Sequence, residues 1–214
     1  MANMTLDEIT EKYLDVLTEV GNIGAGNATS AVANMLGLKV DMSVPHVNLM
    51  EVEKIGSLLG KEEDIIVGIM LGVESDIDGS MMFLMDLPSA HRLVGRMMMM
   101  DVESLTEEQL HSSDFGEMEL SAIQEIGNII AGSYLNALSQ LTNLTLTPTV
   151  PYLAIDMAAS ILSVPAIEFG MVSDKALLIK TDIGGIDMPI NGFYILMPEN
   201  DSYEKILGAL GMPV

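Results

Sequence analysis

The sequence contains an internal repeat, and this repeat restricts the folds that the chain can adopt. At an offset of 106 residues, the segment EVGNIGAG that begins at Glu19 aligns with EIGNIIAG, which begins at Glu125. The same register carries Pro45 onto Pro151 without a gap. Self-similarity of this kind indicates that one structural unit occurs twice and that the two copies pack together.

The similarity continues further along each copy with a changed offset. Asp78-Gly79 comes shortly before the apolar segment MMFLM, and Asn191-Gly192 comes directly before FYILM. Asp-Gly and Asn-Gly pairs are typical of two-residue hairpin turns, so we expect a tight turn at each of them. The repeat therefore extends from the long helical segment into the strands that follow it.

A polar, acidic stretch separates the two copies. Residues 101–113 contain several acidic residues together with Gln, His and Ser, as expected for a connection. We therefore predict a first half at 1–105 and a second half at 106–214, fused in one globular domain. With 214 residues, of which 49% are hydrophobic, the chain is long enough to bury a sizeable core.

Each half is predicted to form a long helix, then strands, then a short helix. The first long helix is expected to begin at Thr5, where Glu8 completes a capping box, and the second to span 115–141. Strands are expected at 40–47, 65–73, 80–85, 144–152, 167–172, 176–181 and 193–197, and short helices at 89–98 and 202–210. This order predicts a two-layer α+β fold with pseudo-twofold symmetry, in which long helices pack on an antiparallel β-sheet.

Each long helix has an apolar side and a polar side. In the first copy, the side predicted to face the sheet comprises Leu6, Ile9, Tyr13, Val16, Leu17 and Val20. Asp15, Glu19 and Asn22 lie at positions i, i+4 and i+7 and form a second stripe, roughly 140° away around the helix. These three residues, the first triad, are therefore expected to point together at solvent.

The second copy repeats this arrangement. Ser121, Glu125 and Asn128, the second triad, lie opposite an apolar stripe made of Phe115, Ala122, Ile123, Ile126, Ile129 and Ile130. Exposed positions change freely because surface substitutions usually cost little, yet the glutamate and the asparagine occur in both copies. Gly21 and Gly127 lie between them, where glycine destabilises a helix, and close approach of a partner would explain both glycines.

Composition excludes several classes of function. Nine lysines and arginines against 31 aspartates and glutamates give a net charge of -22, which repels nucleic acids and anionic lipid surfaces. The chain has no cysteine, which excludes a cysteine phosphatase. It has neither an apolar stretch of bilayer-spanning length nor the start of a signal peptide. We therefore expect a cytoplasmic protein with no membrane insertion and no nucleic-acid partner.

The spacing of the repeated residues resembles a known family, the CheC, CheX and FliY chemotaxis phosphatases. The family pattern is (Asp/Ser)-x3-Glu-x2-Asn-x22-Pro, and it fits here as Asp15-x3-Glu19-x2-Asn22-x22-Pro45 and as Ser121-x3-Glu125-x2-Asn128-x22-Pro151. The resemblance covers nearly the whole chain, and a paired match without gaps is far more specific than one short motif. CheX-type members resemble a single-site version, so the chain is most similar to CheC.

The resemblance implies a role for each of these residues. The substrate would be the aspartyl phosphate of a CheY-type response regulator, and Asn22 and Asn128 would each orient a water in line with its phosphorus. Glu19 and Glu125 would pair with a lysine of the regulator. The supporting residues would be Asp15, Ser121, Pro45 and Pro151, with the prolines in a structural role. The chain would have no cofactor of its own, and Mg2+ would belong to the regulator.

Other interpretations predict different functions. Gly24-Ala25-Gly26 is similar to part of a nucleotide-binding loop, but it lacks the third glycine, a preceding strand and a Lys-Ser/Thr pair. The three histidines have no spacing typical of metal ligands. The family resemblance itself leaves a second hypothesis, in which the chain is mainly a non-catalytic binding module for CheD or another chemotaxis protein.

Overall fold

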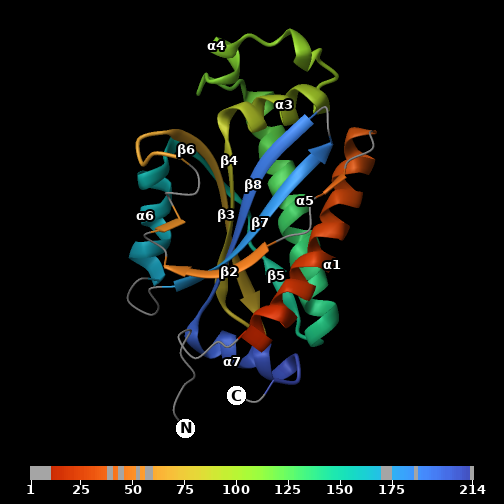
Figure 1. The fold of residues 1–214 in the computed structure, drawn as a ribbon, viewed down its shortest axis with the longest axis vertical. Helices are drawn as coiled ribbons and strands as arrows, with labels where there is room; N and C mark the ends of the chain where they lie inside the picture. The colour runs from red at the N-terminus through yellow and green to blue at the C-terminus, as the bar shows by residue number, and fades with distance from the viewer. Residues whose placement is uncertain are drawn as a thin grey trace.

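An antiparallel β-sheet runs through the molecule, with helices on both of its faces (Figure 1). The computed structural model describes residues 11–37, 41–42, 46–51, 54–55, 60–169, 175–185 and 188–212. The first copy of the repeat contributes α1 (Glu11–Leu36), β1 (Asp41–Met42), β2 (His46–Glu51), β3 (Ile65–Ser75), β4 (Gly79–Asp86) and α3 (Leu87–Met97). The second contributes α5 (Glu117–Thr142), β5 (Leu146–Pro148), β6 (Tyr152–Met157), α6 (Ala158–Phe169), β7 (Lys175–Gly185), β8 (Met188–Pro198) and α7 (Asn200–Ala209). Between the copies lie the short helices η2 (Val102–Ser104) and α4 (Glu107–Leu110).

The order of the strands reveals the pseudo-twofold symmetry of the fold. Strands pair in the order β1-β7-β8-β4-β3-β5, while β2 also pairs with β7 and β6 also pairs with β3. In the central pair, β4 with β8, Met82 lies opposite Ile195. β4 follows β3 in the first copy as β8 follows β7 in the second, so β4 and β8 are the equivalent strands of the two copies. The pseudo-twofold axis therefore passes between β4 and β8, and the predicted internally duplicated α+β fold is confirmed.

Each copy of the repeat supplies the outer strands that flank the inner strands of the other copy. β1 and β2 pair with β7, so that His46 lies opposite Lys180. β5 and β6 pair with β3 in the equivalent way, so that Tyr152 lies opposite Met70. The two inner strands that receive these partners, β3 and β7, are both 11 residues long. Strand pairing in each copy therefore depends on the presence of the other copy.

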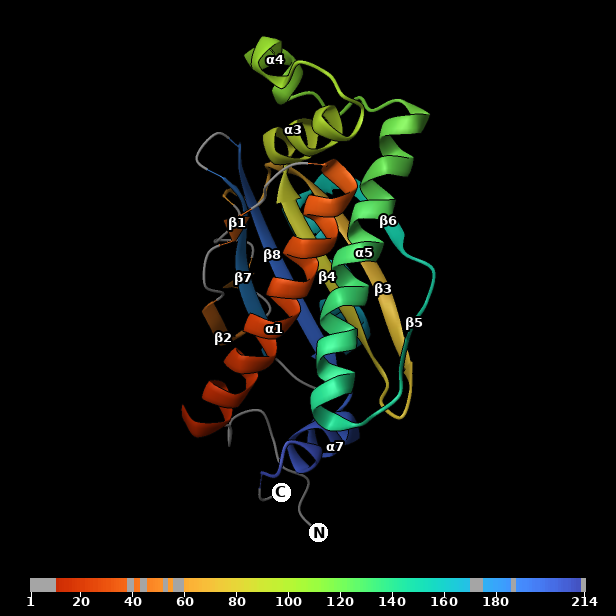
Figure 2. The same ribbon diagram turned by 90° about the vertical axis from the view of Figure 1, so that its right-hand side faces the viewer.

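The long helices α1 and α5 lie side by side on one face of the sheet and run in opposite directions (Figure 2). Their apolar stripes face the sheet as predicted: Leu17 and Val20 of α1, and Ile123 and Ile126 of α5, are buried in the main core. Val16 is half-buried and packs beside α7. The described part of the chain does not include Thr5, Leu6, Ile9 or the side chain of Tyr13.

The two long helices are in close contact at a glycine of α1. A Cβ atom on Gly24 would lie 2.5 Å from Cδ1 and 3.1 Å from Cα of Tyr134, so glycine is needed for α1 to come this near to α5. Tyr134 stacks on Tyr194 of β8, with the ring centroids 4.3 Å apart. The Tyr194 hydroxyl donates to Sδ of Met81 at 2.9 Å, and burial raises the pKa of Tyr194 well above its usual value. This stack joins the helix layer to the centre of the sheet.

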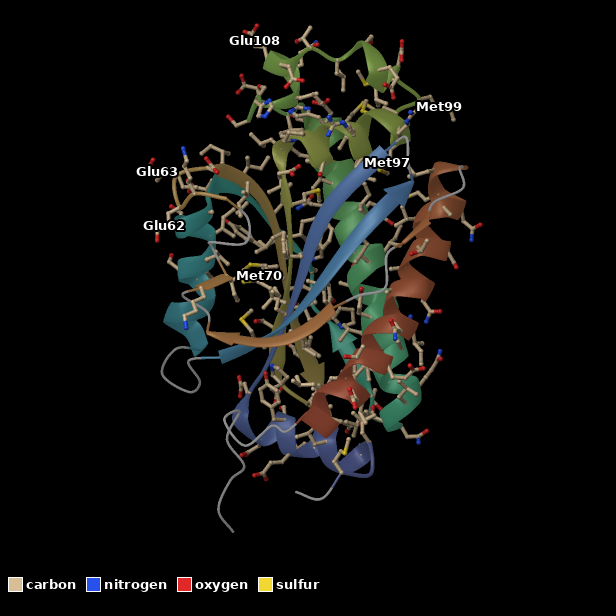
Figure 3. All side chains as sticks on the ribbon, in the orientation of Figure 1. Glu62, Glu63, Met70, Met97, Met99 and Glu108 are labelled. Carbon is tan, nitrogen blue, oxygen red and sulfur yellow. The ribbon has the colours of Figure 1, made fainter. Side chains whose placement is uncertain are left out.

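The opposite face of the sheet is covered in part by α6, a helix that is not among the predicted elements. Ala158, Ile161 and Leu162 of α6 are buried in a second core cluster together with residues of β3, β4 and β8. Met70 of β3, labelled in Figure 3, packs against this cluster. The spacing of the buried α6 residues, i, i+3 and i+4, is that of one helix face.

The predicted strand at 167–172 is therefore wrong where the structure describes it. Residues 167–169 belong to α6, and 170–172 lie outside the described residues. An apolar segment of this length is compatible both with a buried strand and with a buried helix, and periodicity alone does not separate the two. Burial against β3, β4 and β8 decides for the helix.

Two other predicted strands are each divided. The segment 40–47 contains β1 and the start of β2, and 144–152 contains β5 and the start of β6. Between β5 and β6, the Thr149 N–H donates to the carbonyl of Gly72 at 2.9 Å, and the Gly72 N–H donates to Oγ1 of Thr149 at 2.8 Å. A side chain thus takes the place of a main-chain partner in the ladder, which separates the two strands.

Neither glycine-containing dipeptide forms the predicted two-residue turn. Asn191-Gly192 lies inside β8, where it is paired with neighbouring strands. The paired ends of β3 and β4 are joined by residues 74–78, a longer connection. A Cβ atom on Gly79 would lie 2.6 Å from the carbonyl oxygen of Met197. Gly79 is therefore needed for the close approach of β4 to β8, and its role is steric.

The segment between the two copies is held against α3. The His91 ring stacks on Phe115 with centroids 4.2 Å apart, and its Nε2 lies 2.8 Å from the carbonyl oxygen of Ser112. These contacts fix the approach of the chain to α5. Met99, at the end of α3, extends away from the fold and is 95% exposed (Figure 3).

The exchange of outer strands predicts that the halves do not fold separately. We expect fragments 1–105 and 106–214, each produced alone, to show no cooperative thermal unfolding by circular dichroism, because each lacks partners for its strands and much of its core. Mixing the two fragments is expected to restore a single transition. Cooperative unfolding of either fragment by itself would contradict this prediction.

Candidate functional site

The first triad lies on the side of α1 that faces away from the sheet. Asp15 and Glu19 are exposed, and Asn22 is half-buried. Leu17 and Val20, on the other side of the same turns, are buried. Burial of the apolar stripe fixes the rotation of α1 about its axis, so the three polar residues share one outward surface.

The second triad occupies the same surface of α5. Ser121, Glu125 and Asn128 are all exposed, opposite the buried Ile123. The Ser121 hydroxyl donates to the main-chain carbonyl of Glu117 at 2.9 Å, one turn earlier in the helix. The first position of the triad therefore differs in chemistry between the copies, with a carboxylate in α1 and a hydroxyl bonded to its own helix in α5.

The amides and carboxylates of the two triads have no partners among the residues that the structure describes. Neither asparagine side chain, Asn22 or Asn128, forms a hydrogen bond there, and neither Glu19 nor Glu125 forms an ion pair there. A carboxamide carries two N–H donors and one carbonyl acceptor. Each triad thus presents a free hydrogen-bonding group to an incoming molecule, with a carboxylate one turn earlier on the same face.

α1 and α5 lie side by side and antiparallel on one side of the molecule (Figure 2), and each carries one of the two triads. Asn22 precedes Gly24 by two residues, and Asn128 precedes Tyr134 by six, while Gly24 and Tyr134 are in contact. With a rise of 1.5 Å per residue, the two asparagines are roughly 12 Å apart along the helix axes. The triads therefore form two related sites on one helical surface.

The glycines between the glutamate and the asparagine have a different role from the one predicted. Gly127 is buried, and a Cβ atom on it would lie 2.5 Å from Cδ1 and 2.6 Å from Cγ2 of Ile69 in β3. Gly21, at the equivalent position of α1, is also buried. The prediction that a partner's close approach explains these glycines is wrong, because Gly127 contacts the protein's own sheet and neither glycine is exposed.

Of the two prolines in the pattern, the structure describes one. Pro151 is half-buried in the segment that joins β5 to β6. Proline has no N–H to donate to a ladder, so it suits a position between two strands. Pro45 lies outside the described residues.

The other sequence features form no separate site. Gly24-Ala25-Gly26 lies inside α1 and follows no strand, so it is not a phosphate-binding loop. Over the described ranges, no group of three or more acidic or histidine side chains could hold a metal ion. In the same ranges, none of the helices combines the length and the apolar character that a bilayer span requires.

Solved structures with this fold are found among chemotaxis and flagellar proteins. FliY from Thermotoga maritima superposes with a TM-score of 0.75 at 22% identity, covering 95% of this chain and 98% of that chain. A chain of the CheX-CheY-BeF3-Mg2+ complex from Borrelia burgdorferi superposes with a TM-score of 0.52 at 18% identity, covering 87% of this chain and 99% of that chain. The chain thus belongs to a class of internally duplicated α+β proteins by its fold, which it shares with FliY from Thermotoga maritima.

Sequence similarity identifies the family. The CheC-like family matches residues 14–49 and 118–155, two segments that contain both triads and both prolines. CheY-P phosphatase CheC of Bacillus subtilis is 36% identical over 208 residues, which are 95% of this chain and 96% of that protein. The chain belongs to the CheC-like family.

The packing of α5 on the sheet generates a stability prediction. Gly127→Ala is expected to lower the free energy of unfolding by about 1–3 kcal/mol, because the added methyl group meets the branched part of Ile69, a residue buried in the core. The matched control is Gly132→Ala in the same helix, where a Cβ atom would meet nothing within 4 Å. The control is expected to be more stable than wild type by up to about 1 kcal/mol. Urea unfolding measures both changes, and equal stabilities would rule out the Ile69 contact.

Proposed function

We propose that this protein hydrolyses the aspartyl phosphate of a phosphorylated CheY-type response regulator, with Asn22 and Asn128 each orienting the attacking water. The observation that carries the proposal is the repeated, outward-facing asparagine with no partner among the described residues, one turn after an exposed glutamate. Its sequence relative in Bacillus subtilis is named a CheY-P phosphatase, and that relative covers almost the whole chain.

The reaction needs a water molecule placed in line with the bond that breaks. The water oxygen attacks the phosphorus, the bond from phosphorus to the regulator's aspartate oxygen breaks, and the products are inorganic phosphate and a free aspartate carboxylate. An amide is not a base at neutral pH, so the asparagine carbonyl accepts a hydrogen bond from the water and leaves its proton to the phosphate or to solvent. Its contribution is orientation, which is a large one when two reactants must meet in one geometry.

The glutamates set the position of the asparagines. Glu19 and Glu125 each pair with a cation beside the phosphorylated residue of the regulator, and this ion pair sets the register in which the helix docks. Asp15 adds a second carboxylate in the first site, whereas the Ser121 hydroxyl is bonded to Glu117 in the second. The Mg2+ belongs to the regulator, and the similar structure from Borrelia burgdorferi is likewise a complex of CheX with CheY, BeF3 and Mg2+.

Decay of the phosphorylated regulator tests the proposal. Each single variant, Asn22→Ala or Asn128→Ala, is expected to keep the activity of the unchanged site. The double variant is expected to hydrolyse the phosphate about 100-fold more slowly, because the water is no longer held in line. Asn34→Ala and Gln140→Ala are the matched controls, since both residues are exposed, occupy equivalent positions of α1 and α5, and lie outside the triads.

If the double variant matches wild type, asparagine-assisted hydrolysis is excluded. The alternative, a binding module for CheD or another chemotaxis protein, then becomes the better hypothesis. The same decay measurement with and without added CheD separates the two, because a pure binding module accelerates the loss of phosphate in neither case.

A further inference from the structure

A glycine follows each asparagine by one helical turn. Gly26 lies four residues after Asn22, and Gly132 lies four residues after Asn128. At about 100° per residue, each glycine falls within the arc of the helix surface occupied by its triad. The outward surface thus ends, in both copies, in a patch with no side chain.

None of the residues that the structure describes requires a glycine at these two positions. A Cβ atom built on Gly26 or on Gly132 would meet no heavy atom within 4 Å. Neither glycine is among the residues with positive φ, so an L-residue with a side chain could adopt the same backbone. Gly24 and Gly127 contrast with them, because their Cβ atoms would lie 2.5 Å from Tyr134 and Ile69 respectively.

Glycine in the middle of a helix also destabilises the helix relative to alanine, because glycine loses more conformational freedom than alanine when the chain folds. α1 and α5 each contain this unfavourable residue at the same position of the repeat, although an exposed position can differ between the copies, as Asp15 and Ser121 do. Each glycine destabilises the free protein, and no neighbouring atom requires a residue without a side chain there. This points to a requirement that exists only when a partner is bound.

We propose that Gly26 and Gly132 are positioning residues: the docked regulator makes van der Waals contact with the bare helix there, and this contact sets how far Asn22 and Asn128 enter its active site. The inference rests on the proposed function, and it names the part of the helix surface that the docked regulator contacts. A methyl group at either position lifts the partner by roughly the length of one C–C bond, about 1.5 Å. A displacement near 1 Å from the productive geometry is enough to lower a rate about 100-fold.

The test combines activity with stability for Gly26→Ala, Gly132→Ala and the double variant. The double variant is expected to unfold at a midpoint a few degrees higher than wild type, because alanine favours the helix. Its single-turnover rate with phosphorylated regulator, at saturating enzyme, is expected to fall by about 10- to 100-fold. Its affinity for the BeF3-activated regulator is expected to weaken as well. A residue with a purely structural role would shift stability and activity in the same direction.

Asn27→Ala is the matched control, since Asn27 is exposed next to Gly26 but lies outside the arc of the triad. It is expected to leave the rate and the affinity unchanged. If the double glycine variant keeps the wild-type rate, or if its unfolding midpoint falls, the inference is overturned while the proposed function stands. If wild type itself does not accelerate the loss of phosphate, the proposed function fails, and the inference fails with it.

Discussion

The burial of one apolar stripe on each long helix is the constraint on which the rest of this structure depends. Leu17 and Val20 in α1, and Ile123 and Ile126 in α5, are fixed against the sheet, so neither helix can rotate about its axis. A helix that cannot rotate presents a fixed set of residues to solvent. The positions of both triads therefore follow from the core, and no interaction among the polar residues themselves is needed to align them.

The same core explains why the glycines of α1 and α5 divide into two kinds. Gly24 and Gly127 lie where the helices touch Tyr134 and Ile69, and a side chain at either would separate two packed elements. Gly26 and Gly132 face outward with open space above them. The segment EVGNIGAG contains three glycines, of which some serve inward packing and one lies on the outward surface.

Much of the fold could be predicted from the sequence because it depends on periodic patterns. The two long helices, their inward and outward sides and the duplicated α+β class follow from helical spacing and from the repeat. The helix α6 could not be predicted, because its apolar segment is compatible with a buried strand until its contacts with β3, β4 and β8 are known. The predicted turns at the two dipeptides were wrong for a related reason. Gly79 is needed for the close approach of β8, and local turn preferences carry no information about such a tertiary contact.

For the candidate site, helical spacing predicted which residues point outward, and the structure agrees for both triads, with Asn22 less open than Asn128. The choice of Gly21 and Gly127 as points of partner approach failed, because both glycines lie on the buried side of their helices. The helical angle was the usable signal: Gly26 and Gly132 share the angle of the triads, whereas Gly21 and Gly127 do not. The chemical roles of the triad residues remain predictions.

The exchange of outer strands has a consequence for how the two copies can change over time. β2 of the first copy pairs with β7 of the second, and β6 of the second pairs with β3 of the first. A mutation that destabilises the core of one copy therefore reduces the folded population of both. Solvent-facing positions are free of this constraint, as in the replacement of the aspartate of one copy by the serine of the other. An interlocked duplication of this kind can specialise one of its faces, but it cannot discard the scaffold beneath either.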